Sequence, residues 1–225
     1  MPTDAIRVVL AEDSVLAREG IIRIVARAED IELVATCETL AEARAAVERE
    51  HPDVVLTDIR MAPTFTDEGI QLAAELARSH PEIGVLVLSQ HAEPLYALTL
   101  LEHGSKGRGY LLKERLKDSG ELNRSVREIA AGGAIVDPKI VDALLTMQEQ
   151  RERNALEKLT PREREILALV AEGKSNSAVA ESLSIGTRGV ERLINSIFTK
   201  LELGDSDAIS RRVKATLAYL AGQPQ

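Results

Sequence analysis

The chain has 225 residues, of which 44% are hydrophobic and only 2% aromatic, and its net charge is −8. This length suits two domains with aliphatic cores, and a single cysteine excludes an intramolecular disulfide. The N-terminus lacks the layout of a signal peptide, and no apolar run is long enough for a membrane helix, so we expect a soluble, cytoplasmic protein with no membrane partner. Residues 1–154 hold 18 basic and 27 acidic residues, whereas residues 155–225 hold ten and nine, which favours two domains with different partners.

The first ~130 residues alternate between short apolar runs and helix-like stretches. The predicted strands are Ile6–Ala11, Ile31–Cys37, Val54–Asp58, Gly84–Ser89 and Arg108–Leu111. The predicted helices are Leu16–Ala28, Leu40–Glu50, Glu68–Ser79, Pro94–His103 and Ser119–Ala131. Three of the strands are apolar without alternation, which is typical of strands buried on both faces of a parallel sheet. Five strand-and-helix repeats therefore predict a doubly wound α/β domain with a five-stranded parallel sheet, whose site lies beyond the carboxyl ends of the strands.

The rest of the chain is predicted to be helical. A helix begins at Asp137–Pro138, and the polar stretch at 148–154 is interpreted as a linker. Thr160, Pro161 and Glu163 form the pattern of a capping box. The helices that follow are predicted at Pro161–Glu172, Asn176–Leu183, Thr187–Leu201 and Asp207–Leu220. We expect one domain at 1–133, a linker with a helix at 134–155, and an all-α domain of four helices at 156–221.

Acidic and polar groups follow the predicted strands. Glu12 and Asp13 follow the first strand, and Asp58 ends the third. Clustered carboxylates at one sheet edge favour a hard cation such as Mg²⁺. Ser89 ends the fourth strand and Lys113 follows the fifth, so the set suits phosphoryl transfer to Asp58, with Lys113 and Ser89 holding phosphate oxygens. Taken singly, an Asp after a strand is more often a turn or cap residue, so the hypothesis depends on the whole set occurring in order at one edge of the sheet.

The runs VVLAEDS (8–14), DVVLTDIRMAP (53–63), VLVLSQ (85–90) and GYLLKE (109–114) resemble the receiver domain of response regulators, which has a flavodoxin-like fold. The resemblance implies that Asp58 is the phosphoacceptor, that Ser89 and Lys113 act with it, and that Ser89 and Tyr110 form a switch. Tyr110 is alternatively an amphipathic residue at a strand edge. The resemblance also implies a set of Mg²⁺ ligands: Glu12, Asp13, Asp58 and the backbone carbonyl of Arg60. Of the acidic pair Glu12 and Asp13, it favours Asp13 as the direct ligand.

The sequence departs from the receiver pattern in three places. Glu114 stands where many receivers have proline, the usual Met-Pro after the phosphoacceptor is Met61-Ala62-Pro63, and the loop TFTDEG (64–69) is longer than usual. This loop resembles that of a subset of the family. Phe65, in this loop, has three interpretations: a cover for the phosphate pocket, a contact for a kinase, or an anchor for the loop itself.

Residues 159–201 resemble the DNA-binding domain of the NarL/FixJ (LuxR-type) family. The recognition helix would carry an apolar stripe, namely Val190, Ile194, Ile197, Phe198 and Leu201, opposite a polar stripe that suits the major groove. A solvated helix face is the alternative interpretation. The expected DNA contacts are Lys174, Arg188, Glu191, Arg192, Asn195, Thr199 and Lys200, and the two lysines and two arginines among them would touch the phosphate backbone. Glu191 and Leu193 depart from the family pattern and leave the target sequence open.

The two resemblances together imply a two-component response regulator. A sensor histidine kinase would phosphorylate Asp58, and the new charge would draw Ser89 and Tyr110 inward. This change would control homodimerisation, expected at Ile209, Val213 and Leu217, and binding to double-stranded promoter DNA. An aspartyl-phosphate phosphatase or phosphotransferase would need a second Asp at position 60, so we expect no enzyme. A receiver that serves as an interaction module without phosphorylation is the other alternative.

Overall fold

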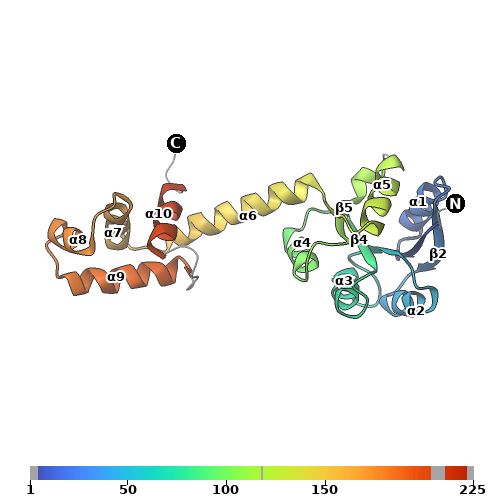
Figure 1. Ribbon diagram of the computed structural model, residues 1–225, viewed down its shortest axis with the longest axis horizontal. Coiled ribbons are helices and arrows are strands. Elements are labelled where there is room, and N and C mark those ends of the chain that lie inside the picture. The colour runs from blue at the N-terminus through green and yellow to red at the C-terminus, as the bar shows by residue number, and fades with distance from the viewer. Residues whose placement is uncertain (1–4, 118, 204–210, 222–225) are drawn as a thin grey trace. The chain divides into compact units, whose positions relative to one another are not determined.

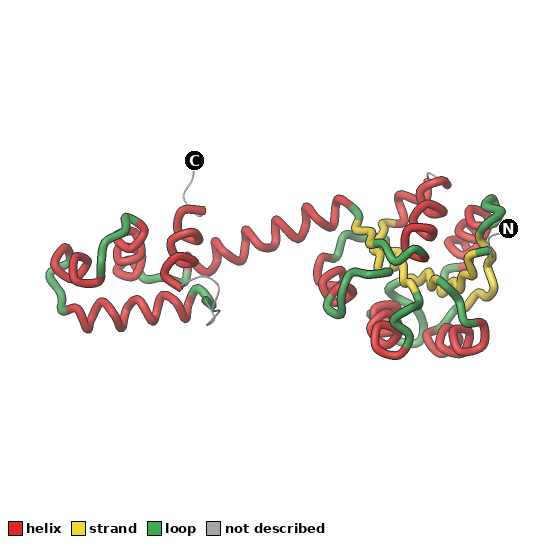
Figure 2. Tube along the Cα trace, in the orientation of Figure 1, coloured by secondary structure: helices red, strands yellow, loops and turns green. Residues whose placement is uncertain are grey.

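The computed structural model describes residues 5–117, 119–203 and 211–221. The chain forms two compact units, Met1–Leu144 and Leu145–Gln225 (Figure 1). The described strands all lie in the first unit, and the described part of the second contains helices and loops only (Figure 2). In the part of the chain that is described, no helix is long and apolar enough to cross a membrane.

The first unit is built on a parallel sheet in the order β2-β1-β3-β4-β5-β6. The strands are β1 (Ile6–Ala11), β2 (Ile31–Cys37), β3 (Val54–Asp58), β4 (Gly84–Ser89), β5 (Arg108–Leu112) and β6 (Ala134–Val136). The doubly wound parallel sheet is confirmed, but the expectation of five strands was wrong. The sixth strand, β6, extends the sheet beside β5 with Val136 opposite Tyr110.

Helices cover both faces of this sheet. They are α1 (Val15–Val25), α2 (Leu40–Glu50), α3 (Glu68–Ser79), α4 (Pro94–Leu101), the 3₁₀ helix η1 (Lys113–Lys117) and α5 (Ser119–Ala130). α1 and α5 lie on one face, and α2, α3 and α4 on the other (Figure 1). Val8 and Leu10 belong to the core under α1 and α5, and their neighbour Val9 to the core on the other face. Burial on both faces explains why these strands show no polar alternation.

The carboxyl ends of β1 and β3 form the point at which the winding of the sheet reverses direction. In open α/β sheets this is where ligands bind. The chain leaving β1 turns at once into α1, because the Ser14 hydroxyl caps that helix by accepting a hydrogen bond from the Ala17 amide. The turn fixes Glu12 and Asp13 between a strand and a capped helix.

α6 (Pro138–Glu157) follows β6. The amide of Asp137 donates to the carbonyl of Tyr110 at 2.9 Å, and its carboxylate accepts from the Lys139 amide at 3.0 Å. Ile140 is fully buried in the core beneath α2, α3 and α4. The helix continues through the polar stretch at 148–154, so it is longer than expected, because Gln, Glu and Arg favour a helix even without apolar anchors.

The second unit contains α7 (Pro161–Ala171), α8 (Asn176–Ser182), α9 (Thr187–Lys200) and α10 (Arg211–Ala221). The predicted capping box at the start of α7 is present, with Thr160 and Glu163 each accepting from the other's amide. The helices enclose an aliphatic core that includes Ile166, Val179 and Ile197. The predicted start of the last helix, at Asp207, lies outside the described residues.

Candidate functional site

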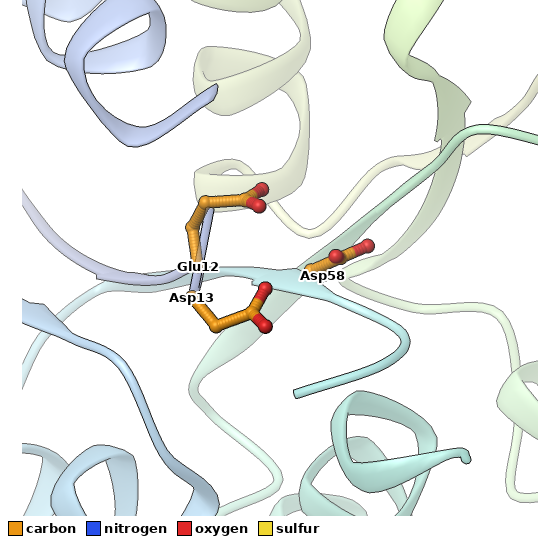
Figure 3. Close-up of side chains that lie close together, drawn as sticks. All are labelled: Glu12, Asp13 and Asp58. Carbon is orange, nitrogen blue, oxygen red and sulfur yellow. The ribbon is translucent and has the colours of Figure 1, made fainter. Parts of the chain in front are cut away.

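Three carboxylates meet at the carboxyl ends of β1 and β3. Glu12, Asp13 and Asp58 each place one oxygen so that these oxygens lie within 4.8 Å of one another. Figure 3 shows the three side chains directed toward a common space from two separate segments. Glu12 is fully buried, whereas Asp13 and Asp58 are partly exposed. The acidic set expected from the strand ends is therefore brought together, with two of its members open to solvent.

Lys113 joins two of these carboxylates. Its Nζ lies 2.7 Å from Glu12 Oε2 and 3.1 Å from Asp58 Oδ2. Burial raises the pKa of Glu12, while the hydrogen bond and the charge of Lys113 act in the opposite direction. The other oxygen of Asp58, Oδ1, accepts a hydrogen bond from the Ile59 amide at 2.8 Å. Asp58 is thus a carboxylate held by its own backbone on one side and faced by an ammonium group on the other.

The loop that follows Asp58 is organised by a buried carboxylate that sequence reasoning missed. Glu68 is 2% exposed and accepts from the amides of Met61, Thr64 and Thr66 at 3.1, 3.1 and 3.0 Å, and from the Thr64 hydroxyl. Burial alone would raise the pKa of Glu68, but these hydrogen bonds outweigh it and lower the value to about 2. The sequence shows Glu68 in the segment TDEG, but its role as an acceptor for the loop amides becomes visible only when the loop is folded.

Gly69 brings this loop against the backbone of Asp58. Its amide donates to the Ile59 carbonyl at 2.9 Å. A Cβ at position 69 would lie 1.8 Å from the Asp58 carbonyl oxygen, so only glycine fits. Loop and phosphoacceptor candidate therefore form one packed assembly.

A pocket of about 140 Å³ adjoins Asp58. It is lined by Asp58, Ile59, Arg60, Ser89, Gln90, His91 and Glu93. The guanidinium of Arg60 donates to both carboxylate oxygens of Glu93, at 3.1 and 2.9 Å. Phe65 is not among the lining residues, which argues against its interpretation as a cover for the pocket.

The two hydroxyl groups expected to form a switch converge on one carbonyl. Ser89 Oγ donates to the His91 carbonyl at 2.9 Å, and Tyr110 OH donates to the same oxygen at 3.1 Å. Tyr110 is 1% exposed, and burial raises the pKa of its hydroxyl. The sequence led us to expect that phosphorylation draws Tyr110 inward. In this structure the Tyr110 side chain is already buried.

In the second unit, α9 exposes a polar face. Arg188, Glu191, Arg192, Asn195 and Thr199 are exposed. The opposite stripe packs into the core, with Val190, Ile194, Ile197 and Leu201 buried and Phe198 partly buried. The expected division of this helix into an apolar and a polar face is present, and Leu193 lies partly buried between them.

The two lysines of the expected DNA contacts are engaged within the unit. Lys200 Nζ lies 2.6 Å from Glu163 Oε2, and Ser196 Oγ donates to the other oxygen at 2.8 Å. The charge of Lys200 therefore holds α9 on α7, and the contact of Lys200 with phosphate stays a prediction. Lys174 pairs with Glu172 at 3.0 Å but remains 38% exposed at the surface.

α10 packs on the core with residues other than those expected in a dimer contact. Ala215 is fully buried and Tyr219 partly buried. Val213 and Leu217, two of the three residues expected in a dimer contact, are 48% and 56% exposed. The third, Ile209, lies outside the described residues.

Two known families match the chain, one in each unit. Residues 8–125 match the response regulator receiver domain, and residues 157–212 match the luxR family of bacterial regulatory proteins. The chain belongs to the response regulators of the NarL/FixJ family. It is 33% identical to the transcriptional regulatory protein DegU of Brevibacillus brevis over 93% of both chains. It is 31% identical to the oxygen regulatory protein NreC of Staphylococcus haemolyticus, over 88% of this chain and 91% of that one.

Solved structures share the architecture of this response regulator. ChrA, the response regulator of a heme-sensing two-component system, is 29% identical with a TM-score of 0.52 over 96% of both chains. The receiver domain of the putative response regulator NarL from Mycobacterium tuberculosis is 31% identical, with a TM-score of 0.51 over 58% of this chain and 99% of that one. RcsB of Salmonella typhimurium, at 21% identity and a TM-score of 0.58 over 97% and 99%, shares the fold.

The regulator is therefore a two-component transcription factor, with a receiver domain and a LuxR-type DNA-binding domain. Receiver domains bind Mg²⁺ at an acidic cluster, and the cluster of this regulator is Glu12, Asp13 and Asp58. A receiver domain implies a histidine kinase partner, and a LuxR-type domain binds DNA.

Proposed function

We propose that a sensor histidine kinase transfers a phosphoryl group to Asp58 and that this transfer controls dimerisation and promoter binding. One observation carries the proposal: Asp58 Oδ2 lies 3.1 Å from Lys113 Nζ, beside an acidic pair and at the wall of a pocket. A carboxylate that is oriented by its backbone and faced by a cation is suited to act as a nucleophile toward phosphorus.

In this transfer an oxygen of Asp58 forms a bond to phosphorus as the bond to the donor's histidine nitrogen breaks. Lys113 and the Ser89 hydroxyl would hold phosphoryl oxygens. Three carboxylates face one ammonium group at this site, which fits a divalent cation with oxygen ligands. Asp13 and Asp58, with Glu12 and the carbonyl of Arg60, would hold Mg²⁺, which neutralises charge on the phosphoryl oxygens.

The switch follows from competition for the Ser89 hydroxyl. This hydroxyl donates to the His91 carbonyl, and a phosphoryl oxygen on Asp58 is a stronger acceptor. When Ser89 turns toward the phosphoryl group, the His91 carbonyl keeps only its hydrogen bond from Tyr110. The segment between β4 and α4 would shift, and Tyr110 would stabilise the new position from inside. In this form the switch acts through His91, with Tyr110 inward throughout.

The output would be DNA binding by a dimer in the bacterial cytoplasm. The exposed face of α9 supports a position in the major groove, with Arg188, Glu191, Arg192, Asn195 and Thr199 toward the DNA and Lys174 near the backbone. The exposed Val213 and Leu217 support α10, with Ile209, as the contact between two copies. A symmetric pair would read two half-sites.

We further propose that the regulator acts through this switch and not through catalytic turnover. A phosphatase of this architecture would need an acid at position 60, where the Arg60 guanidinium pairs with Glu93. A receiver that acts without phosphorylation would have no need of the assembled set of Asp58, Lys113 and Ser89.

Intact-mass spectrometry with acetyl phosphate and Mg²⁺ tests the proposed function. We expect one phosphoryl group on the wild-type chain, none on Asp58→Asn, and slower incorporation on Lys113→Ala. Incorporation that persists on Asp58→Asn, or none on the wild type with acetyl phosphate, would contradict the proposal. Hydrolysis of a phosphomonoester with turnover would support the phosphatase instead.

A further inference from the structure

We propose that Phe65 is a contact residue for the protein that donates the phosphoryl group, a protein that bears a phosphohistidine. The proposal rests on the proposed phosphorylation of Asp58. It concerns how the donor is recognised, which the chemistry at Asp58 leaves open.

Phe65 is an exception among the aromatic residues of the chain. The sequence has two phenylalanines, three tyrosines and no tryptophan, and all five aromatic side chains are described. Phe65 is 56% exposed, whereas the other four are partly or fully buried. An exposed aromatic ring on a defined surface is the type of residue that dominates protein–protein contacts, because it buries a large apolar area with little loss of conformational freedom.

The loop holds the backbone of Phe65 in a defined conformation. The backbone of Phe65 has a φ of 56°, a conformation that is costly for a bulky side chain and persists only when its surroundings impose it. The neighbours impose it here, because Glu68 binds the amides on both sides of Phe65, at Thr64 and Thr66. The Phe65 amide itself donates to the Met61 carbonyl at 2.9 Å.

The loop is also fixed relative to Asp58. Gly69 packs against the Asp58 backbone, and Tyr96 of α4 reaches the Thr66 carbonyl with its hydroxyl at 3.4 Å. Phe65 belongs neither to the lining of the pocket nor to a hydrophobic core among the described residues. These observations argue against the interpretations of Phe65 as a pocket cover or a loop anchor and favour contact with a partner.

The position beside Asp58 indicates which partner. A protein that delivers a phosphoryl group to this pocket must come close to the loop, because the loop begins at Thr64, shortly after Asp58 in the chain, and is packed on Asp58 through Gly69. Val15 and Leu16, which follow Asp13 at the start of α1, are 64% and 85% exposed. Exposed apolar groups next to two segments of the acidic cluster suit a protein donor, whereas a small acyl phosphate needs only the pocket.

Phosphorylation by two different donors distinguishes a contact with the partner protein from an effect on the chemistry at Asp58. The protein donor is chosen from a panel of sensor histidine kinases of the source organism, autophosphorylated with ATP, as the one that transfers fastest to the wild type. The small donor is acetyl phosphate. Phe65→Asn removes the ring but suits the left-handed backbone, Phe65→Tyr keeps the ring, and Val141→Ala removes an exposed apolar side chain elsewhere in the same unit.

We expect Phe65→Asn to lower kcat/KM with the kinase by roughly 10-fold or more, as for a central aromatic contact, and to leave the rate with acetyl phosphate unchanged. Phe65→Tyr and Val141→Ala should transfer at the wild-type rate. An equal loss with both donors would overturn the proposal, because it would mean that the loop positions Asp58. An unchanged kinase rate would also overturn it, and if dimerisation were lost instead, Phe65 would contact a second copy. Failure of the wild type to accept from either donor would refute the proposed function itself.

Discussion

In each unit a buried glutamate, Glu68 or Glu163, fixes a functional segment, and the two glutamates differ in what they bind. Glu68 in the receiver and Glu163 in the DNA-binding unit are 2% and 3% exposed. In both, burial alone would raise the pKa, but hydrogen bonds lower it to about 2. Glu68 binds three backbone amides and a hydroxyl group, whereas Glu163 binds one backbone amide, the hydroxyl group of Ser196 and the ammonium group of Lys200.

The difference follows from the secondary structure of the segment that is held. The loop at 64–69 has no helix or strand to pair its amides, so a carboxylate takes that role and gives the loop one shape. The amides of α9 are paired within the helix, so Glu163 binds side chains and holds one helix on another. Glu68 therefore determines the backbone conformation of a loop, whereas Glu163 determines how two helices pack.

Lowering the pH should remove the stabilisation that Glu68 and Glu163 provide, and we expect this to be the largest effect on the free energy of unfolding. The folded pKa values of Glu68 and Glu163, about 2, lie below the ordinary value of 4.5, so unfolding is accompanied by proton uptake at low pH. Their stabilisation is present above about pH 4.5 and is lost as the pH falls toward about 2. Urea unfolding between these values should show a steep fall in the free energy of unfolding. The double variant Glu68→Gln, Glu163→Gln should show a shallower fall, and an equal slope would contradict this account.

Glu163→Leu should be the most destabilising single substitution of this comparison. It removes the charged acceptor of the partly exposed Lys200 ammonium and of the Thr160 amide, and each hydrogen bond to a charged group contributes about 1.5–3 kcal/mol. The measurement is the free energy of unfolding of the full chain, followed in the second unit by amide hydrogen exchange. Glu165→Leu is the matched control on the same helix, because its carboxylate pairs with Arg162 at the surface and should contribute less than about 1 kcal/mol.

Glu68→Gln should have a smaller and more local effect. The amide keeps one acceptor oxygen but loses the charge that binds Met61, Thr64 and Thr66, at a cost of about 1–3 kcal/mol. Hydrogen exchange should speed up at these three amides while the central strands stay protected. Glu75→Gln, on the surface of α3, is the control. Unchanged exchange in the loop would show that Glu68 does not determine its shape.

Substitutions on α9 should separate packing from DNA contact and have the smallest expected effect. Arg192→Ala should weaken DNA binding by roughly 10-fold, or about 1.4 kcal/mol, without a change in stability. Lys200→Met should do the reverse, because its ammonium is bound by Glu163. Anisotropy titrations at two salt concentrations, with thermal melts of the same samples, measure both quantities. Equal effects of the two variants on DNA binding would return Lys200 to the set of DNA contacts.

Most of the first unit was predictable because its strands are uninterrupted apolar runs. Such runs predict a parallel sheet, and the parallel sheet in turn predicts that Glu12, Asp58 and Lys113 meet at one edge. β6 escaped prediction because it has three residues and pairs with β5 only after α5 has brought the chain back. The length of α6 was underestimated because polarity was given more weight than helix propensity.

The details of both sites depend on packing that no local pattern records. Glu68 is one acidic residue among many until the loop folds around it. Lys200 looks like other cations of the recognition helix, and its pairing depends on the distance from α9 to Glu163 of α7. The inward position of Tyr110 is a matter of side-chain conformation, so the sequence predicted a role for the residue but not its state.

The affinity for DNA before and after phosphorylation tests the central claim most directly. The probe is the DNA sequence that the phosphorylated full-length chain enriches from a random library, and the titration is done at one fixed salt concentration. We predict that acetyl phosphate with Mg²⁺ tightens binding by the wild type at least roughly 10-fold and leaves Asp58→Asn unchanged. Equal affinity of the wild type before and after treatment, with Asp58 shown by mass spectrometry to be phosphorylated, would contradict the account.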